Sequence, residues 1–276
     1  MAAVFKKFSL DPQTVDFMGH AVALHTNDDY LTQVAMPTIQ KMSLYMESVG
    51  KYGDSPFLYP VYGLGGLPES FSRLCAIHGG TYMLNAKVDG IIMENSKVAG
   101  VKIDGVIAKA PLVICDPSYA KEQKVTKIVG RVIRAICILD HPIPNTNNAQ
   151  SIQIILPQKQ MNRKSDIYIS MVSGTHNVCK QGLYLAIVSA TVETNDPQAE
   201  IKPALDLLGA TLDVFITITD LQEAVNDPKV DRLFVTSSYD ATSHFESASQ
   251  DILDMYENIV GEKLEFNIQP DNEEEY

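Results

Sequence analysis

The side chains that could carry out catalysis or bind a metal form no catalytic pattern in this sequence. None of the six histidines belongs to an H-E-x-x-H motif, and the four cysteines form no C-x-x-C pair. The G-x-S-x-G turn of a serine nucleophile is also missing. Asp28 and Asp29 are typical of a turn that ends a helix rather than of a metal site. We therefore predict no metal site and no enzyme activity. The histidines are His20, His25, His78, His141, His176 and His244, and the cysteines are Cys75, Cys115, Cys137 and Cys179.

A glycine-rich turn at residues 63–68 is the nearest approach to a dinucleotide-binding motif. Pro68 stands where G-x-G-x-x-G requires its third glycine. The turn also lacks the preceding strand and the acidic residue about 20 positions further on. We therefore predict no flavin or nicotinamide cofactor. Pro68 instead suits the first turn of a helix, where its missing N–H costs nothing, and Glu69 follows where the helix dipole favours an anion.

The elements around this turn can be predicted from residues 55–84. An aromatic loop leads into the turn, and a short helix follows with Phe71, Leu74 and Cys75 on one apolar stripe. Gly79 and Gly80 end that helix. Thr81-Tyr82-Met83-Leu84 then has the composition of a strand.

Length and charge limit the class of protein. The chain has 276 residues, of which 45% are hydrophobic, so it can bury a substantial core. The net charge of −12 argues against nucleic acid as a partner, because phosphate binding needs clustered Lys and Arg. Widely spaced cysteines in a chain this large indicate reduced thiols. There is no signal-peptide run and no stretch approaching about 18 apolar residues, so we expect a cytoplasmic protein.

The pattern of the chain changes near residue 56. Residues 1–55 are predicted to form a partial helical domain. Its helices are expected from residue 9 to about 52, with one helix starting at Asp11-Pro12 and a second following Pro37. Residues 56–265 alternate strands and helices, and residues 266–276 form an acidic, disordered tail. The expected strands are 91–93, 98–103, 106–110, 112–115, 132–139, 152–156, 167–172, 184–192 and 233–236, and the expected later helices cover 196–208 and 245–259.

Several long and unusual strings resemble one family, the Rab GDP-dissociation inhibitors and their relatives, the Rab escort proteins. The strings are KYGDSP, GLGGLPESFSRL, CDPSY, HPIPNTN, KSDIY and SSYDATSHFES. The chain matches the family only after roughly its first third. The resemblance implies an α+β fold derived from α/β: a truncated, flavoprotein-like domain with mixed sheets, plus a partial helical domain.

The resemblance also implies which residues bind. The family's Rab-binding platform corresponds to Gly66, Arg73, Thr81 and Met83, and Gly66 stands where the family normally has a Glu. Its mobile loop corresponds to Lys51, Tyr52 and Phe57, and its prenyl groove to Met18, Met42 and Met46. Taken without the resemblance, Arg73 is typical of a solvated helix residue and the methionines are typical of ordinary helix core. The loop residues fit an interdomain linker as well as they fit a binding loop.

The function implied by the resemblance is binding rather than catalysis. Such a protein binds prenylated, GDP-bound Rab GTPases, slows GDP release, shields the geranylgeranyl lipid and associates transiently with membranes in vesicle traffic. Three alternatives stay open at this point: an escort protein that presents Rab for prenylation, a flavin-dependent oxidoreductase built on the shared scaffold, and an inactive fragment.

Overall fold

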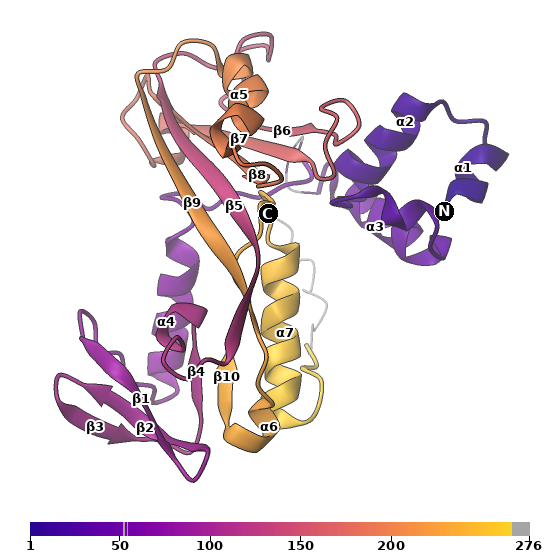
Figure 1. Cartoon of the computed structure of the whole chain (residues 1–276). Coiled ribbons are helices and arrows are strands. Elements are labelled where there is room, and N and C mark those ends of the chain that lie inside the picture. Colours follow the sequence, from indigo (N-terminus) through magenta and orange to yellow (C-terminus); the bar gives the residue numbers. More distant parts are fainter. Residues whose placement is uncertain (52, 54, 267–276) are drawn as a thin grey trace, which may run out of the picture. The chain divides into compact units, whose positions relative to one another are not determined.

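The computed structural model describes residues 1–51, 53 and 55–266, which form two compact units (Figure 1). The first unit comprises Met1–Met83, Gly130–Thr219 and Asp240–Ser243. The second comprises Leu84–Val129, Asp220–Tyr239 and the residues from His244 onward. Tyr52 and the predicted tail beyond residue 266 lie outside the described residues.

The first unit begins with short helices, which we name the helical segment (residues 1–48). Asp11 caps one of them, because its carboxylate accepts hydrogen bonds from the backbone N–H groups of Gln13 and Thr14, both at 3.0 Å. The predicted start at Asp11-Pro12 is therefore confirmed, whereas the first helix was not predicted. The helix expected after Pro37 begins slightly earlier and holds this proline in its first turn. The elements are α1 (Ala2–Lys7), α2 (Pro12–Asp16), the π-helix η1 (Phe17–Val22), the 3₁₀ helix η2 (Asp28–Leu31) and α3 (Ala35–Ser48).

The helical segment has its own small hydrophobic core. Met1, Phe5 and Tyr30 are buried at its centre, and side chains of α2, η1 and α3 pack against them. Gly19 lies inside η1 against the Tyr30 ring, so closely that a Cβ atom at this position would clash with the ring. Glycine is therefore needed here for packing.

A five-stranded sheet forms the larger part of the first unit. Its strand order is β6-β7-β8-β5-β9, and the pairs β6–β7, β7–β8 and β8–β5 are antiparallel. The strands are β5 (Thr126–Leu139), β6 (Ser151–Leu156), β7 (Ile167–Ser173), β8 (Tyr184–Thr191) and β9 (Asp213–Ala224). The first four were predicted. β9 was missed.

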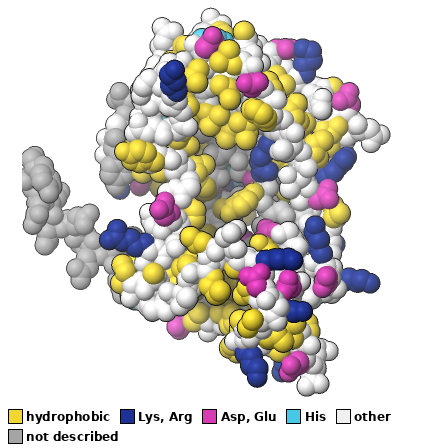
Figure 2. All heavy atoms as spheres, turned by 90° about the vertical axis from the view of Figure 1, so that its left-hand side faces the viewer, with side chains coloured by type: hydrophobic (Ala, Val, Ile, Leu, Met, Phe, Trp, Pro, Cys, Tyr) yellow, Lys and Arg dark blue, Asp and Glu magenta, His cyan; other side chains and the backbone are white. Residues whose placement is uncertain are grey.

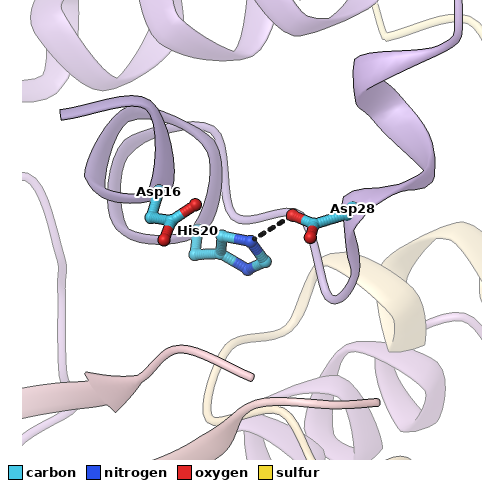
Figure 3. A group of neighbouring side chains, drawn as sticks. All are labelled: Asp16, His20 and Asp28. Atoms are coloured by element: carbon cyan, nitrogen blue, oxygen red, sulfur yellow. Dashed lines mark hydrogen bonds and ion pairs between the residues drawn. The ribbon is translucent and has the colours of Figure 1, made fainter. Parts of the chain in front are cut away.

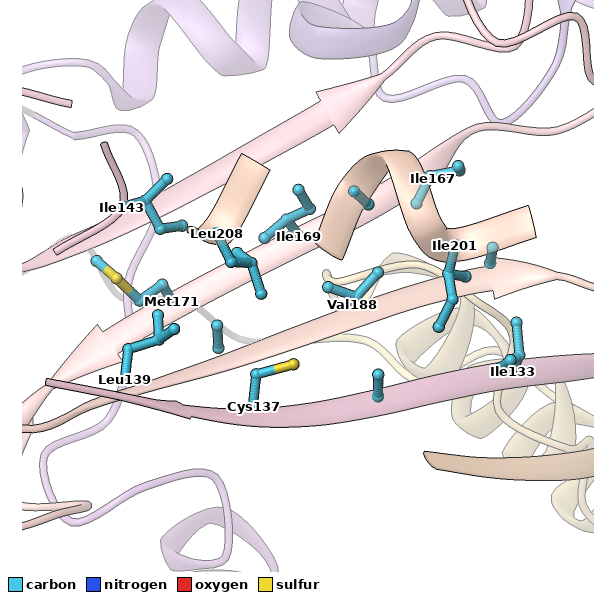
Figure 4. Packing of buried hydrophobic residues seen from close by; sticks show 14 residues of the cluster. Ile133, Cys137, Leu139, Ile143, Ile167, Ile169, Met171, Val188, Ile201 and Leu208 are labelled. Carbon is cyan, nitrogen blue, oxygen red and sulfur yellow. The ribbon is translucent and has the colours of Figure 1, made fainter. Parts of the chain in front are cut away.

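The helix α5 (Pro197–Leu208) closes the main hydrophobic core against one face of this sheet. Alternate residues of β5, from Ile133 to Leu139, are completely buried, as the two-residue period of a strand requires. Ile201 and Leu208 of α5 are equally buried and lie among the labelled side chains of the strands (Figure 4). The predicted helix over 196–208 is confirmed, with Asp196 as its cap.

The second unit contains two small sheets and the helix α7. The turn between β2 and β3 is Asp104-Gly105, with φ of 48° and 80°, as expected for a two-residue hairpin. β4 pairs in parallel with β10, and both belong to the strands that were predicted. The elements are β1 (Val88–Glu94), β2 (Lys97–Ile103), β3 (Val106–Lys109), β4 (Val113–Cys115), η3 (Pro117–Tyr119), α6 (Pro228–Asp231), β10 (Leu233–Val235) and α7 (Glu246–Val260). Helices and mixed sheets together make the predicted α+β protein.

Hydrophobic helices of membrane-spanning type do not occur in the described part of the chain, where no helix is both long and apolar enough to cross a bilayer.

Candidate functional site

The helix α4 (Gly66–Ile77) belongs to the first unit and presents an apolar surface to solvent. None of its residues is buried, although Phe71, Leu74 and Ile77 are large and hydrophobic. Hydrophobic side chains are spread over much of the face of the molecule that Figure 2 shows. Large exposed apolar areas usually mark interaction sites. The predicted stripe of Phe71, Leu74 and Cys75 is therefore available to a partner.

The loop before α4 is fixed to the sheet of the first unit. The backbone N–H of Tyr62 donates to the carbonyl of His176 at 2.9 Å, and the Tyr59 and His176 rings meet edge to face. His176 ends the 3₁₀ helix η4 (Gly174–His176), which directly follows β7. The start of α4 is thus held by contacts from a rigid element.

The end of α4 follows the prediction, but the strand expected after it is absent. Gly79 adopts φ of 88°, and the Gly80 N–H returns to the carbonyl of Cys75 at 3.0 Å. Residues 81–84 are exposed and irregular, so the strand prediction was wrong. A strand needs a paired neighbour, and none of the described strands pairs with these residues.

The predicted platform residues lie on α4 and on the segment that follows it. Arg73, Thr81 and Met83 are all exposed, and the Arg73 side chain makes no hydrogen bond or ion pair with the described residues. Gly66 begins α4 with open space around the position of a Cβ atom. A longer side chain at this position would therefore fit.

The predicted mobile loop is only partly described, because Tyr52 lies outside the described residues. Lys51 is exposed. The Phe57 ring lies 6.1 Å from the Tyr45 ring of α3 in an edge-on arrangement, so this aromatic side chain contacts the helical segment.

The three predicted groove methionines occupy different surroundings. Met18 and Met42 pack against the core of the helical segment, whereas Met46 on α3 is 67% exposed. The structure thus places Met18 and Met42 against the same core and leaves Met46 on the surface.

Sequence reasoning missed a cluster of ionisable side chains, which we name the His20 cluster (Asp16, His20, Asp28, Lys159 and Asp166). Figure 3 shows the His20 ring between Asp16 and Asp28. The His20 Nδ1 lies 2.6 Å from the Asp166 carboxylate, and Nε2 lies 3.2 Å from that of Asp28. The i, i+4 spacing of Asp16 and His20 indicates two side chains on one helix face and was the available signal.

Asp16, His20 and Asp28 have ligand atoms close enough to hold a metal ion, all within 4.8 Å of one another. The Lys159 ammonium, however, lies 2.9 Å from Asp16 and 3.1 Å from Asp28. The chain therefore supplies its own cation to these two carboxylates. The expectation that Asp28 lies in a turn that ends a helix was wrong, because Asp28 begins η2, and its carboxylate belongs to this cluster.

The environment of His20 favours its protonated form. Burial of the ring works to lower its pKa, but the hydrogen bond and charge of Asp166, together with those of Asp28, outweigh burial and raise the pKa above its ordinary value. Asp28 shifts the other way: hydrogen bonds from Lys159 and His20 outweigh its burial, and its pKa is lowered.

Comparison with known proteins places this chain in a family. A model described as "GDP dissociation inhibitor" matches residues 1–271. The chain belongs to the GDP dissociation inhibitor (GDI) family. The resemblance seen in the sequence is confirmed.

Two relatives of this GDI-family chain are similar over nearly all of its length. It is 53% identical over 266 residues to Rab GDP dissociation inhibitor beta of Rattus norvegicus, which covers 96% of the chain and 59% of the rat protein. The crystal structure of a Rab GDI from Plasmodium falciparum superposes with a TM-score of 0.92 at 53% identity, over 96% of this chain and 60% of the Plasmodium chain. The chain thus spans less than two thirds of each of these relatives.

Proposed function

We propose that this GDI-family chain binds the GDP-bound form of a Rab GTPase and slows release of its nucleotide. In this proposal, α4 and residues 81–83 form the contact surface, and the chain supports extraction of Rab from membranes and its delivery to them in vesicle traffic. The partner is proposed because both relatives are named as Rab GDP dissociation inhibitors, written Rab GDI for the Plasmodium protein.

The observation that carries this proposal is the exposed apolar helix α4, which carries an arginine that none of the described residues engages. Interfaces between proteins commonly combine apolar contacts with an arginine anchor, whose planar group can bind carboxylates or carbonyls. Arg73 is not engaged by the described residues, so its donors are available to a partner. Met83 adds a flexible apolar contact and Thr81 a polar one.

We further propose that residues 1–55 form a partial helical domain that shields the prenyl group of the partner. Met18 and Met42 lie in the helical core and Met46 lies on its surface, so a lipid chain could contact flexible side chains in both places. Each CH₂ group removed from water contributes about 0.8 kcal/mol. Lys51, Tyr52 and Phe57 are proposed to contact the membrane transiently.

Substitution of Arg73 tests the contact surface. Arg73→Ala should weaken binding to prenylated, GDP-loaded Rab by about 1–3 kcal/mol, the size expected for an interface anchor, as measured by titration calorimetry. Arg131→Ala is the matched control, because Arg131 is an exposed arginine on β5, away from α4 in the sequence. Equal losses for the two variants would contradict the proposal, and so would unfolding of Arg73→Ala seen by circular dichroism.

The lipid state of the partner separates an inhibitor from an escort protein. An inhibitor should prefer prenylated over unprenylated GDP-bound Rab in the same titration. Preference for unprenylated Rab, together with support of prenyl transfer by a prenyltransferase, would favour the escort alternative.

We propose that the chain is a cytoplasmic binding protein rather than an enzyme, and that it does not bind nucleic acid. The flavin-dependent alternative makes a simple spectroscopic prediction. Purified protein with a stoichiometric visible flavin spectrum would overturn the binding proposal.

A further inference from the structure

The helical segment and the five-stranded sheet have separate hydrophobic cores. The core of the helical segment draws all its side chains from residues 1–42, and the core of the sheet draws all of its side chains from residues 133–216. Ion pairs of the His20 cluster join the two regions: His20 to Asp166, and Lys159 to Asp16 and Asp28. Attachment of the helical segment to the sheet region therefore depends on charge.

The position of His20 makes this attachment sensitive to protons. Both ring nitrogens face carboxylate oxygens, of Asp166 on the sheet side and of Asp28 on the helical side. An imidazolium ion donates to both carboxylates, whereas a neutral ring donates to only one and turns a lone pair toward the other. Loss of the proton therefore removes one charge-assisted hydrogen bond and one positive charge.

Lys159 supplies the second connection from a position that solvent can reach. Its ammonium bridges Asp16 and Asp28, while its side chain is 50% exposed. Asp166 is buried and accepts the backbone N–H of Gln158 at 2.8 Å, which fixes the sheet side of the cluster. A backbone hydrogen bond thus fixes the sheet side of the cluster, and the helical side is held by ion pairs that include a titratable ring.

Water can reach the boundary beside the cluster. A cavity of about 240 Å³ is lined by Thr26 and Asn27 of the helical segment and by Asp166, Lys164 and Thr191 of the sheet region, among others. Because this boundary is not filled by side chains, a proton can exchange with solvent close to His20.

We propose that the His20 cluster is a proton-operated clasp that holds the helical segment on the sheet when His20 is charged and loosens when His20 is neutral. The charged and titratable groups facing the ring are Asp16 of α2, Asp28 of η2, Asp166 before β7 and Lys159 after β6, and the Tyr30 ring packs against it edge-on. The clasp would thereby control the segment proposed above to hold the prenyl group, and only this consequence rests on the proposed function.

The direction of the effect follows from the titration of His20. Its pKa is raised in the folded protein, so its contribution is complete below the ordinary value of about 6.5 and is lost as the pH rises through the folded value. At the acid end the clasp also weakens, because the carboxylates become protonated. Docking is therefore strongest between these two limits.

Hydrogen exchange of the wild-type chain tests the clasp without Rab or lipid, so its result does not depend on the proposed function. The helices α2 and η2 are too short to be stable alone, so loosening should expose their amides. Between about pH 5 and pH 9, a range that brackets the ordinary histidine pKa, the protection factors of residues 11–31 should fall about tenfold or more. The protection of β7 should stay constant.

The midpoint of that fall should coincide with the titration of the His20 ring followed by NMR. A fall in residues 11–31 and β7 together would mean global unfolding and would overturn the proposal. Protection of residues 11–31 that does not change with pH would overturn it equally.

Three variants separate the clasp from general stability. His20→Gln should abolish the pH dependence in residues 11–31, and His141→Gln should leave it unchanged. His141 is a suitable control because its pKa is also raised, by hydrogen bonds to the carbonyls of Pro142 and Ala210, both outside the cluster. Lys159→Met should lower the protection and move the His20 midpoint to higher pH, because it removes a nearby positive charge. An unchanged midpoint in Lys159→Met, or a lost pH dependence in His141→Gln, would overturn the clasp.

Discussion

The helices α4 and α5 are each 12 residues long and amphipathic, yet they end up in opposite environments. α5 buries Ile201, Ala204 and Leu208 against the sheet, whereas α4 buries nothing. The same pattern of apolar residues therefore builds a core in one place and an exposed surface in the other. An amphipathic helix predicts that an apolar face will be covered, but not whether the chain itself or a partner covers it.

The connections of the two helices explain the difference. α5 follows β8 closely, and its Glu200 accepts hydrogen bonds from the Thr194 N–H and hydroxyl, which fold the connection back over the sheet. Arg163 then joins Glu200 at 2.6 Å. α4 is anchored through the loop before it, at Tyr59 and Tyr62, so its apolar face remains available.

Truncation of an apolar side chain should affect the two helices very differently. Ile201→Ala should lower the free energy of unfolding by about 2–5 kcal/mol, because it leaves a cavity in the main core. Leu74→Ala in α4 should change it by less than about 0.5 kcal/mol, since this side chain is half exposed. Urea denaturation of both variants measures the difference, and similar losses would mean that α4 also packs in a core.

Removal of the Glu200 charge should show how much more the buried ion pair of α5 contributes to stability than an exposed ion pair does. Glu200→Gln should cost about 1.5–3 kcal/mol of unfolding free energy at neutral pH, because the buried Arg163 loses a charged partner. Asp206→Asn is the matched control on the same helix: its exposed pair with Lys202 should contribute less than about 1 kcal/mol.

The pH dependence of the Glu200 effect has a definite sign. Burial works to raise the pKa of Glu200, but hydrogen bonds from Thr194 and Arg163 outweigh it and lower the pKa. The contribution is therefore present above the ordinary carboxyl range and is lost as the pH falls through the folded value. The wild type and Glu200→Gln should converge in stability during acid denaturation, and a constant gap would contradict this assignment.

Addition of a side chain to α4 should change binding of the partner without lowering the stability of the chain, as expected for an exposed helix. Gly66→Glu should strengthen binding to GDP-loaded Rab by about 0.5–1.5 kcal/mol, since open space surrounds this position and one charge-assisted contact is added. The stability of the chain should not fall, because the first turn of a helix favours an anion. Titration of Gly66→Gln provides the uncharged control, and equal affinity of the two variants would rule out a charge contact.

Local signals predicted much of the fold. Asp11 and Asp196 mark helix starts because a cap acts within three residues, and Asp104-Gly105 marks a hairpin for the same local reason. Residues 81–84 have strand composition but lie outside any sheet, while β9 is a strand through its pairing in the sheet. Strand formation depends on neighbours that a local pattern does not contain.

The candidate sites also divide into residues with a local sequence signal and residues brought together only by the fold. The predicted platform residues all belong to one continuous stretch of sequence, residues 66–83. Only the Asp16–His20 half of the His20 cluster has a local signal, because Asp166 and Lys159 lie more than 140 positions away in the sequence from their partners His20 and Asp16. Contacts over such a distance along the chain arise from the fold and could not be predicted from spacing.

The parallel pairing of β4 with β10 has a consequence for how the chain is made. All of Gly130–Thr219 lies between these two three-residue strands. Their pairing must therefore close a very long loop, which costs conformational entropy, while only a few backbone hydrogen bonds form in return. Formation of the five-stranded sheet, in which β5 and β9 are neighbours, shortens that loop first. During synthesis, Val113–Cys115 leaves the ribosome long before Leu233–Val235 exists. We therefore expect the second unit to be completed last. In this order of folding, β4 remains unpaired until the five-stranded sheet has formed.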